Sequence, residues 1–254
     1  MKARCILVIA KWILALLLAL PLPPGPATAG AAATIEEQAV EALMRGDLEL
    51  FKMLLNKAAG PNAKDRHAAI ALMLAMADDN LRVIGLLIDK GLDINAKIVK
   101  DTTALMLAAA GGKEEIVKLL IDKGADVNAR TNDGDTALTI ASNAGELEIA
   151  KLIAEKGADI DAKRKDCATA LLAAVHRGHL QIAKVLINKG ADVNVRMGNG
   201  GTALMDAAQQ GRVEIAKLLI ENGANIDGTT KDGRMALMLA AEKSDVEIVE
   251  LLIV

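Results

Sequence analysis

The chain has 254 residues, a formal net charge of −3 and only two aromatic residues, Trp12 and Phe51. Because so few aromatic rings are present, the interior must consist of Leu, Ile, Val, Met and Ala, which suits layers of closely packed short helices. Residues 1–29 contain three basic residues and no acidic one, so the rest of the chain carries a net charge of −6. This charge, and the lack of a basic stripe with aromatic residues, argue against nucleic acid as a partner.

Residues 1–29 have the pattern of a cleavable export signal. A basic start is followed by an apolar stretch over residues 6–20 and by the small-residue cleavage site Ala27-Thr28-Ala29. Lys11 interrupts the apolar stretch and four prolines follow it, which disfavours a transmembrane helix. We therefore expect a periplasmic or secreted protein that has no membrane attachment after cleavage, with residues 30–34 as a short linker.

Beyond this leader, the sequence repeats with a fixed period. Glycines recur every 33 residues, and so do threonines that are each followed by Ala-Leu. The glycines are Gly91, Gly124, Gly157, Gly190 and Gly223, and the threonines are Thr103, Thr136, Thr169 and Thr202. A period of this length predicts a stack of similar structural units, each in contact with its neighbours.

Each unit is predicted to contain two short helices. In residues 98–130, Thr103 can accept a backbone hydrogen bond at the start of the first helix, and Leu105 lies on the apolar face of that helix. Gly112 separates it from a second helix, whose apolar face includes Ile116. Helices this short are unstable alone, so each pair must be stabilised by packing against the adjacent pairs.

The segment between one helix pair and the next is predicted to form a finger-like β-turn. Gly124 supplies the left-handed residue that ends the second helix. Asp126 and Asn128 follow it, and their side chains can hydrogen-bond the local backbone, which favours a turn over further helix. The predicted fold class is therefore all-α, with short β-turn fingers between helix pairs.

The order of these motifs resembles the ankyrin repeat family. Thr103-Ala-Leu-Met-Leu-Ala-Ala, Glu115-Ile-Val-Lys-Leu-Leu and Gly124-Ala-Asp-Val-Asn-Ala follow the family pattern. The resemblance implies an ankyrin repeat solenoid of six to seven helix-turn-helix units over residues 35–254. The approximate units are 32–64, 65–97, 98–130, 131–163, 164–196, 197–229 and 230–254.

The sequence departs from the family pattern at three positions of the unit. The proline that the family carries after the threonine is Ala in five units, at positions 104, 137, 170, 203 and 236. The histidine that the family carries in the first helix is replaced in five units, by Met106, Thr139, Leu172, Met205 and Met238. We therefore expect apolar contact where the family makes a polar bond between units. The fingertip glycine is retained in three units, but it is Asp101 and Cys167 in two others.

The resemblance also implies a binding surface. Ankyrin arrays bind other proteins along a concave side made by the fingertips and the exposed end of each first helix, which predicts a non-catalytic module that binds another protein. The predicted helix positions are Asp78, Asn143, His176, Arg177, Gln209, Gln210, Glu242 and Lys243, and the predicted fingertip positions are Lys100, Asn132, Asp133, Lys165, Asn199 and Lys231. Any one of these residues could equally be a solvated surface residue, so they carry the prediction only as a set.

The last unit suggests an alternative role. Residues 247–254 repeat the interior apolar pattern without the polar replacements of a terminal cap. An exposed apolar edge would allow self-association, whereas a frayed end shielded by Glu247 and Glu250 would not. A structural or assembly protein that forms homo-oligomers through this edge is therefore the second hypothesis.

No residue pattern predicts catalysis, a metal or a cofactor. His176 and His179 form a histidine pair, but Gly178 lies between them and no further ligand accompanies them, so structural roles are favoured over a metal site or a hydrolase. Cys167 is expected to be an exposed thiol without a role. The repeated aspartates lack the glycine of a calcium loop, and neither a phosphate-binding loop nor a G-x-S-x-G or H-E-x-x-H motif occurs.

Overall fold

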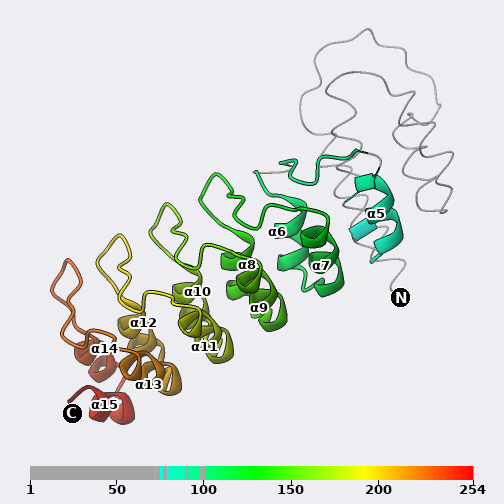
Figure 1. Cartoon of the computed structure of the whole chain (residues 1–254). Helices are drawn as coiled ribbons and strands as arrows, with labels where there is room; N and C mark the ends of the chain where they lie inside the picture. The colour runs from blue at the N-terminus through cyan, green and yellow to red at the C-terminus, as the bar shows by residue number, and fades with distance from the viewer. Residues whose placement is uncertain (1–71, 73–74, 77–78, 90, 98–100, 254) are drawn as a thin grey trace, which may run out of the picture. The chain divides into compact units, whose positions relative to one another are not determined.

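The computed structural model describes residues 72, 75–76, 79–89, 91–97 and 101–253 (Figure 1). The chain divides into two compact units, residues 1–93 and 94–254. The predicted leader, the linker and the predicted repeat 32–64 lie outside the described residues, as do the candidate site residues Asp78 and Lys100. Among the helices of the described ranges, none is both long enough and apolar enough to cross a membrane.

The described part of the first unit contains one complete helix, α5 (Leu81–Asp89). Asn80 precedes it, and its Oδ1 atom accepts a hydrogen bond from the N–H of Val83 over 3.2 Å. Ile84 and Leu87 are buried. The helix thus has the polar start and the apolar face that the repeat pattern predicts.

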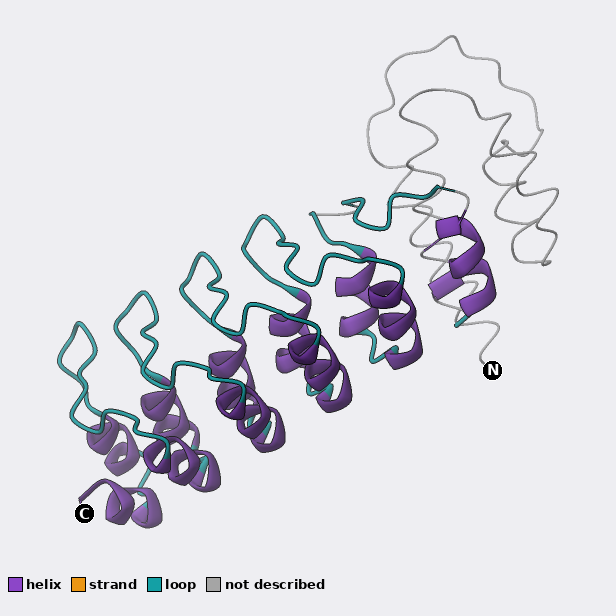
Figure 2. Ribbon diagram, viewed as in Figure 1, coloured by secondary structure: helices purple, strands orange, loops and turns teal. Residues whose placement is uncertain are grey.

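The second unit consists of helix pairs that stack side by side, with the finger loops projecting on one side (Figures 1 and 2). The pairs are α6 (Ala104–Ala110) with α7 (Glu114–Asp122), α8 (Ala137–Ala144) with α9 (Leu147–Glu155), α10 (Ala170–Arg177) with α11 (Leu180–Asn188), α12 (Ala203–Gln210) with α13 (Val213–Glu221), and α14 (Ala236–Glu242) with α15 (Val246–Ile253). The part of the chain that the structure describes contains no β-strand. The predicted all-α array of helix pairs is therefore confirmed.

Threonine side chains start four of the first helices, as predicted. Each has an extended backbone, and its Oγ1 atom accepts a hydrogen bond from the backbone N–H three residues further on. These residues are Thr103, Thr136, Thr169 and Thr202. A cap of this kind stabilises a helix by about 1 kcal/mol. Met235 occupies the same position before α14 and provides no side-chain cap.

The core runs through the stack as repeated layers of aliphatic residues. The first helices bury Leu105, Leu138, Leu171 and Leu204, and the second helices bury Ile116, Ile149, Ile182, Ile215 and Ile248. First helices pack on neighbouring first helices, and second helices contact neighbouring second helices. Because a fully buried leucine or isoleucine contributes about 1.5–3 kcal/mol, most of the stability must come from contacts between adjacent pairs.

The residues that replace the family histidine behave in three ways. Met106, Leu172 and Met205 are buried, which agrees with the expected apolar contact. Met238 is 49% exposed, so the expectation is wrong at this position. Thr139 is also buried, but it forms a capping box with Thr136, in which each hydroxyl accepts from the other residue's backbone N–H, at 2.8 and 3.2 Å. At this position a polar bond is kept, and it lies within one repeat instead of between repeats.

The fingertip position has a left-handed backbone conformation, whichever residue occupies it. Gly134 and Gly200 have φ angles of 86° and 85°, and Asp101 and Cys167 have φ angles of 58° and 64° at the equivalent positions. The backbone N–H of Lys165 donates to the carbonyl oxygen of Asp133 over 2.9 Å. Neighbouring fingertips are therefore tied together by the backbone even where glycine is absent.

Candidate functional site

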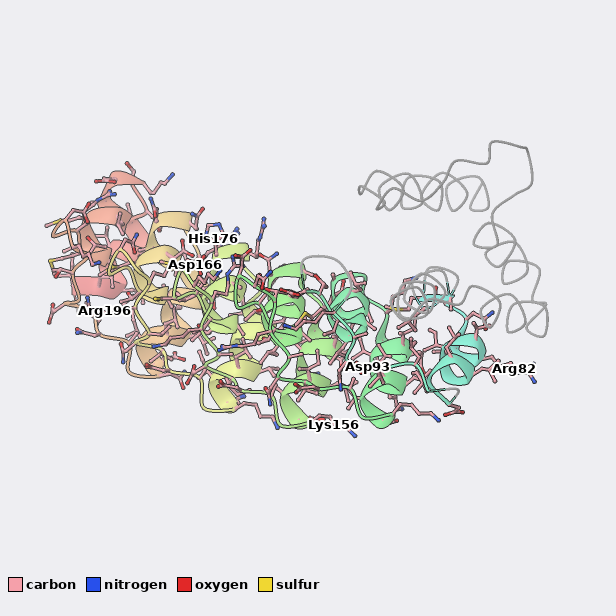
Figure 3. All side chains as sticks on the ribbon, turned by 90° about the horizontal axis from the view of Figure 1, so that it is seen from above. Arg82, Asp93, Lys156, Asp166, His176 and Arg196 are labelled. Atoms are coloured by element: carbon pink, nitrogen blue, oxygen red, sulfur yellow. The ribbon has the colours of Figure 1, made fainter. Side chains whose placement is uncertain are left out.

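The exposed ends of the first helices and the finger loops form one surface, which we call the inner face. Its helix residues are Asn143, His176, Arg177, Gln209, Gln210, Glu242 and Lys243, and its finger residues are Asn132, Asp133, Lys165, Asn199 and Lys231. All of these predicted positions are exposed. In the view of Figure 3, His176 lies on the edge of the array opposite to Lys156, which follows the second helix α9.

The structure brings Asn143 and Arg177 together. Both lie in the last turn of a first helix, in α8 and α10 respectively. Arg177 Nε donates a hydrogen bond to Asn143 Oδ1 over 3.0 Å. Because both side chains are exposed, the contact adds little to stability, but it orients the guanidinium across two repeats.

His176 contacts an acidic residue of the next repeat. Its Nδ1 atom lies 3.2 and 3.1 Å from the two carboxylate oxygens of Asp206, in the first turn of α12. The side chain of Asp206 is only 11% exposed, against 58% for His176. The carboxylate therefore fixes one side of an imidazole whose other side faces solvent.

Asp206 was not among the predicted site residues, although the sequence held a signal for it. The equivalent positions of the other described repeats are Leu107, Ile140, Ala173 and Leu239. A carboxylate in an otherwise apolar series departs from the framework, and such a departure indicates a residue kept for a local purpose.

Glu242 is paired with a second residue that was not predicted. Arg234 Nη2 donates to Glu242 Oε2, and the arginine lies at the end of the preceding finger. Its equivalents are Thr102, Asp135, Ala168 and Gly201, which share no chemical property. The sequence held no signal for Arg234, because only the reach of its side chain connects it to the helix.

A pocket of about 110 Å³ lies at the bases of the fingers formed by residues 197–201 and 230–234. It brings together two predicted residues, Asn199 and Gln209, with Asp206 and Arg234. Its lining further includes Met197, Met205, Asp232 and Leu239. The inner face thus has a hollow with apolar, amide and charged groups at this place.

The carboxylate of Asp232 is held in its ionised form. A hydrogen bond from the Thr230 side chain lowers the pKa of Asp232 below its ordinary value of 3.8. A bond from its own backbone N–H and the charge of Arg234 act in the same direction. The pocket therefore contains a permanent negative charge at neutral pH.

Other predicted residues stand apart from these contacts. The side chains of Asn132, Gln210, Lys231 and Lys243 make no hydrogen bond or ion pair within the described ranges. Lys165 Nζ lies 3.9 Å from Asp133 Oδ1, and both side chains are about three-quarters exposed. The structure places these residues on the inner face but does not fix their side chains.

His176 and His179 contact different residues: His176 lies beside Asp206, whereas His179 packs on Gly145. His179 precedes α11, and its ring covers Gly145 so closely that a methyl group there would lie 2.7 Å from the ring. Among the residues that the structure describes, no three His, Cys, Asp or Glu side chains come together in a way that could hold a metal ion. Cys167 is partly buried, so the expectation of an exposed thiol is wrong.

Models of one protein family match most of the sequence. The model described as ankyrin repeats (3 copies) matches residues 72–164, 127–197 and 161–230, and the model described as ankyrin repeat matches residues 232–254. A search of curated proteins found no match. The matched segments include every helix pair described above and the fingers between them.

Proposed function

The chain belongs to the ankyrin repeat family, and on that premise we propose that it binds a protein partner on the inner face without catalysing a reaction. Ankyrin repeats are generally modules of protein–protein interaction. The observation that supports this surface is the set of contacts between repeats that orient its exposed side chains. These are the Asn143–Arg177 hydrogen bond and the His176–Asp206 pair.

Fixed side chains matter because binding is opposed by the ordering of the groups that make contact. Each rotamer-rich side chain that is immobilised only on binding weakens the association by about 0.5–1.5 kcal/mol. Arg177 and His176 are oriented before any partner arrives. The second helices also carry ordered pairs: Lys151–Glu148 lies within one repeat, whereas Lys217–Glu247 joins two repeats. On the inner face, the oriented Arg177 and His176 side chains therefore lower the cost of binding a partner.

Proteins with ankyrin repeats are typically not enzymes. The His176–Asp206 pair has two of the three groups of a hydrolytic triad. Within the described ranges, however, no hydroxyl or thiol is hydrogen-bonded to His176. A histidine oriented by a carboxylate in this way is suited to contact a partner.

Affinity capture from an extract of the native host tests the proposal. The full-length protein is compared with a variant in which Asn143, His176, Arg177, Gln209 and Gln210 are changed to Ala. The matched control changes Lys118, Glu155, Lys184, Lys189 and Glu221, which are exposed on or after second helices, to Ala. Before the capture, circular dichroism must show that all three proteins have equal helicity.

We expect a protein that the parent and the control variant retain and that the inner-face variant loses. A protein retained equally by all three would contradict binding on the inner face. If only the control variant fails to retain the protein, the binding site lies on the second helices and not on the inner face.

We also propose that the protein acts in the periplasm or outside the cell. The support is the leader pattern of residues 1–29, with its apolar stretch and the Ala27-Thr28-Ala29 site.

Self-association is the second candidate function, and exposed apolar side chains in the last repeat favour it. Met238, Val246 and Ile253 are 49%, 66% and 67% exposed. Elsewhere in the described ranges, the one other exposed large apolar residue is Leu81, which is 37% exposed. Sedimentation of the parent and of a Val246→Lys variant at several concentrations tests this role, since a concentration-dependent dimer should be weakened by the lysine.

A further inference from the structure

The pocket at the bases of the fingers 197–201 and 230–234 has the lining of a site for one side chain. We propose that it binds an arginine or lysine side chain of the protein partner, an inference that rests on the proposed function. The argument depends on the charge of the lining, the burial of one carboxylate and the size of the hollow.

The charges of the lining favour a cation. Asp206 and Asp232 contribute two carboxylates, against the single guanidinium of Arg234. Arg234 is itself neutralised by Glu242 through their ion pair. A positively charged group that enters the pocket therefore meets a lining with more carboxylates than guanidinium groups, which favours it over a carboxylate.

Because Asp206 is nearly buried, it favours a cation in the pocket more strongly than an exposed carboxylate would. Its side chain is only 11% exposed, so a partner that covers the pocket would remove most of its remaining water. An ionised carboxylate without water needs a partner charge or several hydrogen bonds. His176 Nδ1 can donate only one N–H to this carboxylate, which leaves further lone pairs of Asp206 for an arginine or lysine.

The shape of the pocket suits a long basic side chain. Its volume of about 110 Å³ corresponds to roughly eight water-sized groups at about 10–15 Å³ each, which is comparable with an arginine side chain. Met197, Met205 and Leu239 supply apolar surface for an aliphatic stem. Asn199 and Gln209 supply amide groups that can bond to its polar end.

The carboxylate of Asp206 occurs in only one of the described repeats. At the position of Asp206, the preceding repeats have Ala173 and Ile140, so the carboxylate is not a framework residue. The proposed specificity therefore resides between α12 and the last two fingers.

A random peptide library displayed on phage provides the test. The library is selected against the full-length protein, and the tightest peptide is then synthesised with each basic residue replaced by citrulline, which keeps the shape of arginine and removes its charge. Binding is measured by calorimetry against the parent, Asp206→Asn and the control Asp122→Asn, which lies at the end of the second helix α7.

The proposal expects selected peptides to contain a basic residue whose replacement by citrulline weakens binding at least about tenfold. Asp206→Asn should weaken the parent peptide by a similar factor but leave the citrulline peptide unchanged, since the two changes remove one interaction. Asp122→Asn should have no effect. Equal binding of the arginine and citrulline peptides to the parent protein would overturn the inference, whatever the stability of the Asp206 variant.

The outcomes separate this inference from the proposed function. Peptides that tolerate citrulline but lose binding on Arg177→Ala would overturn the basic pocket and leave the inner face as the binding surface. Peptides that tolerate all the inner-face changes, or a selection that yields no binding peptide, would contradict both.

Discussion

The side-chain amide of Asn194 donates a hydrogen bond to the carbonyl oxygen of Gly223, in the next repeat, over 3.0 Å. Its Oδ1 atom accepts from the backbone N–H of Asn225 over 2.7 Å. Asn128 makes the corresponding contact with the carbonyl oxygen of Gly157 over 3.2 Å. An asparagine at this position therefore ties each finger base to the end of the following repeat's second helix.

Asp161 occupies the same position in the repeat between them. Its carboxylate accepts from the backbone N–H of Asp192 over 3.0 Å, but a carboxylate cannot donate to the carbonyl oxygen of Gly190. We predict that Asp161→Asn adds this bond and raises the free energy of unfolding by about 0.5–1.5 kcal/mol. Urea denaturation followed by circular dichroism measures the change.

The reverse exchange at Asn194 is the control for this prediction. Asn194→Asp removes the donor to Gly223 and should lower the free energy of unfolding by a similar amount. If both exchanges destabilise the protein, the side-chain donor is not what distinguishes the two residues.

Cys167 carries backbone strain at a fingertip. It has a φ angle of 64° where the neighbouring fingers have Gly134 and Gly200. A left-handed conformation is unfavourable by about 1–2 kcal/mol for a residue with a Cβ atom, and the greater freedom of unfolded glycine offsets part of that. We therefore predict that Cys167→Gly raises the free energy of unfolding by about 0.5–1 kcal/mol, measured by urea denaturation under reducing conditions.

Gly134→Ala is the matched opposite change. Its new Cβ would lie 3.0 Å from Arg164 Cα, a backbone atom that cannot easily move, so this variant should be clearly less stable than the parent. A Cys167→Gly protein that unfolds at lower urea than the parent would show that the strain at Cys167 is compensated by contacts of its side chain.

The helices and fingers could be predicted because their determinants are local and repeated. Thr103 caps α6 through a bond to Met106, three residues away, and Gly124 takes a left-handed conformation after α7. The capping threonine and the left-handed glycine recur every 33 residues, so the structure predicted for one unit applies to the others. Where the local chemistry changes, as at Thr139, the sequence pattern alone did not predict the capping box that forms.

The candidate site could be predicted only in outline. Register placed Asn143, His176 and Gln209 on the exposed face, since exposure follows from helical periodicity. The partners of these residues could not be predicted, because His176 reaches Asp206 across 30 residues of sequence. Such contacts depend on the distance between stacked repeats and on side-chain length, which the 33-residue period does not specify.

Ser142 is a buried hydroxyl without a hydrogen-bond partner in the described structure. The equivalent residues of the other repeats include Ala109, Val175 and Ala208, so the site accepts an apolar side chain. We predict that Ser142→Ala raises the free energy of unfolding, by up to about 1 kcal/mol, because it removes a hydroxyl that is buried without a bond. Thermal and urea denaturation measure the difference.

A contrasting change is available one turn earlier in the same helix. Thr139→Val removes the hydroxyl that accepts from the N–H of Thr136 and should lower the free energy of unfolding by about 1 kcal/mol. Destabilisation by Ser142→Ala would indicate that its hydroxyl is bonded in solution.

Export predicts a defined change in the mass of the protein. Cleavage after Ala29 removes Trp12, and because the sequence has no tyrosine, the remaining protein should barely absorb at 280 nm. Intact mass spectrometry of protein purified from its native host should therefore give the mass of residues 30–254. A mass that includes Trp12 would contradict cleavage.

Asp232 gives the stability a pH dependence of known sign. Its pKa is lower in the folded protein than its ordinary value of 3.8, chiefly because the Thr230 side chain bonds to the carboxylate. A lowered folded pKa means that the contribution is present above the unfolded pKa and is lost as the pH falls through the folded pKa. We predict that Asp232→Asn is slightly less stable than the parent at neutral pH, and that the gap narrows as the pH falls through the folded pKa. Thr230→Val should lose the same pH-dependent part of the stability, and urea denaturation of the three proteins at neutral and at acidic pH measures it. A gap that widens as the pH falls would contradict the assigned direction.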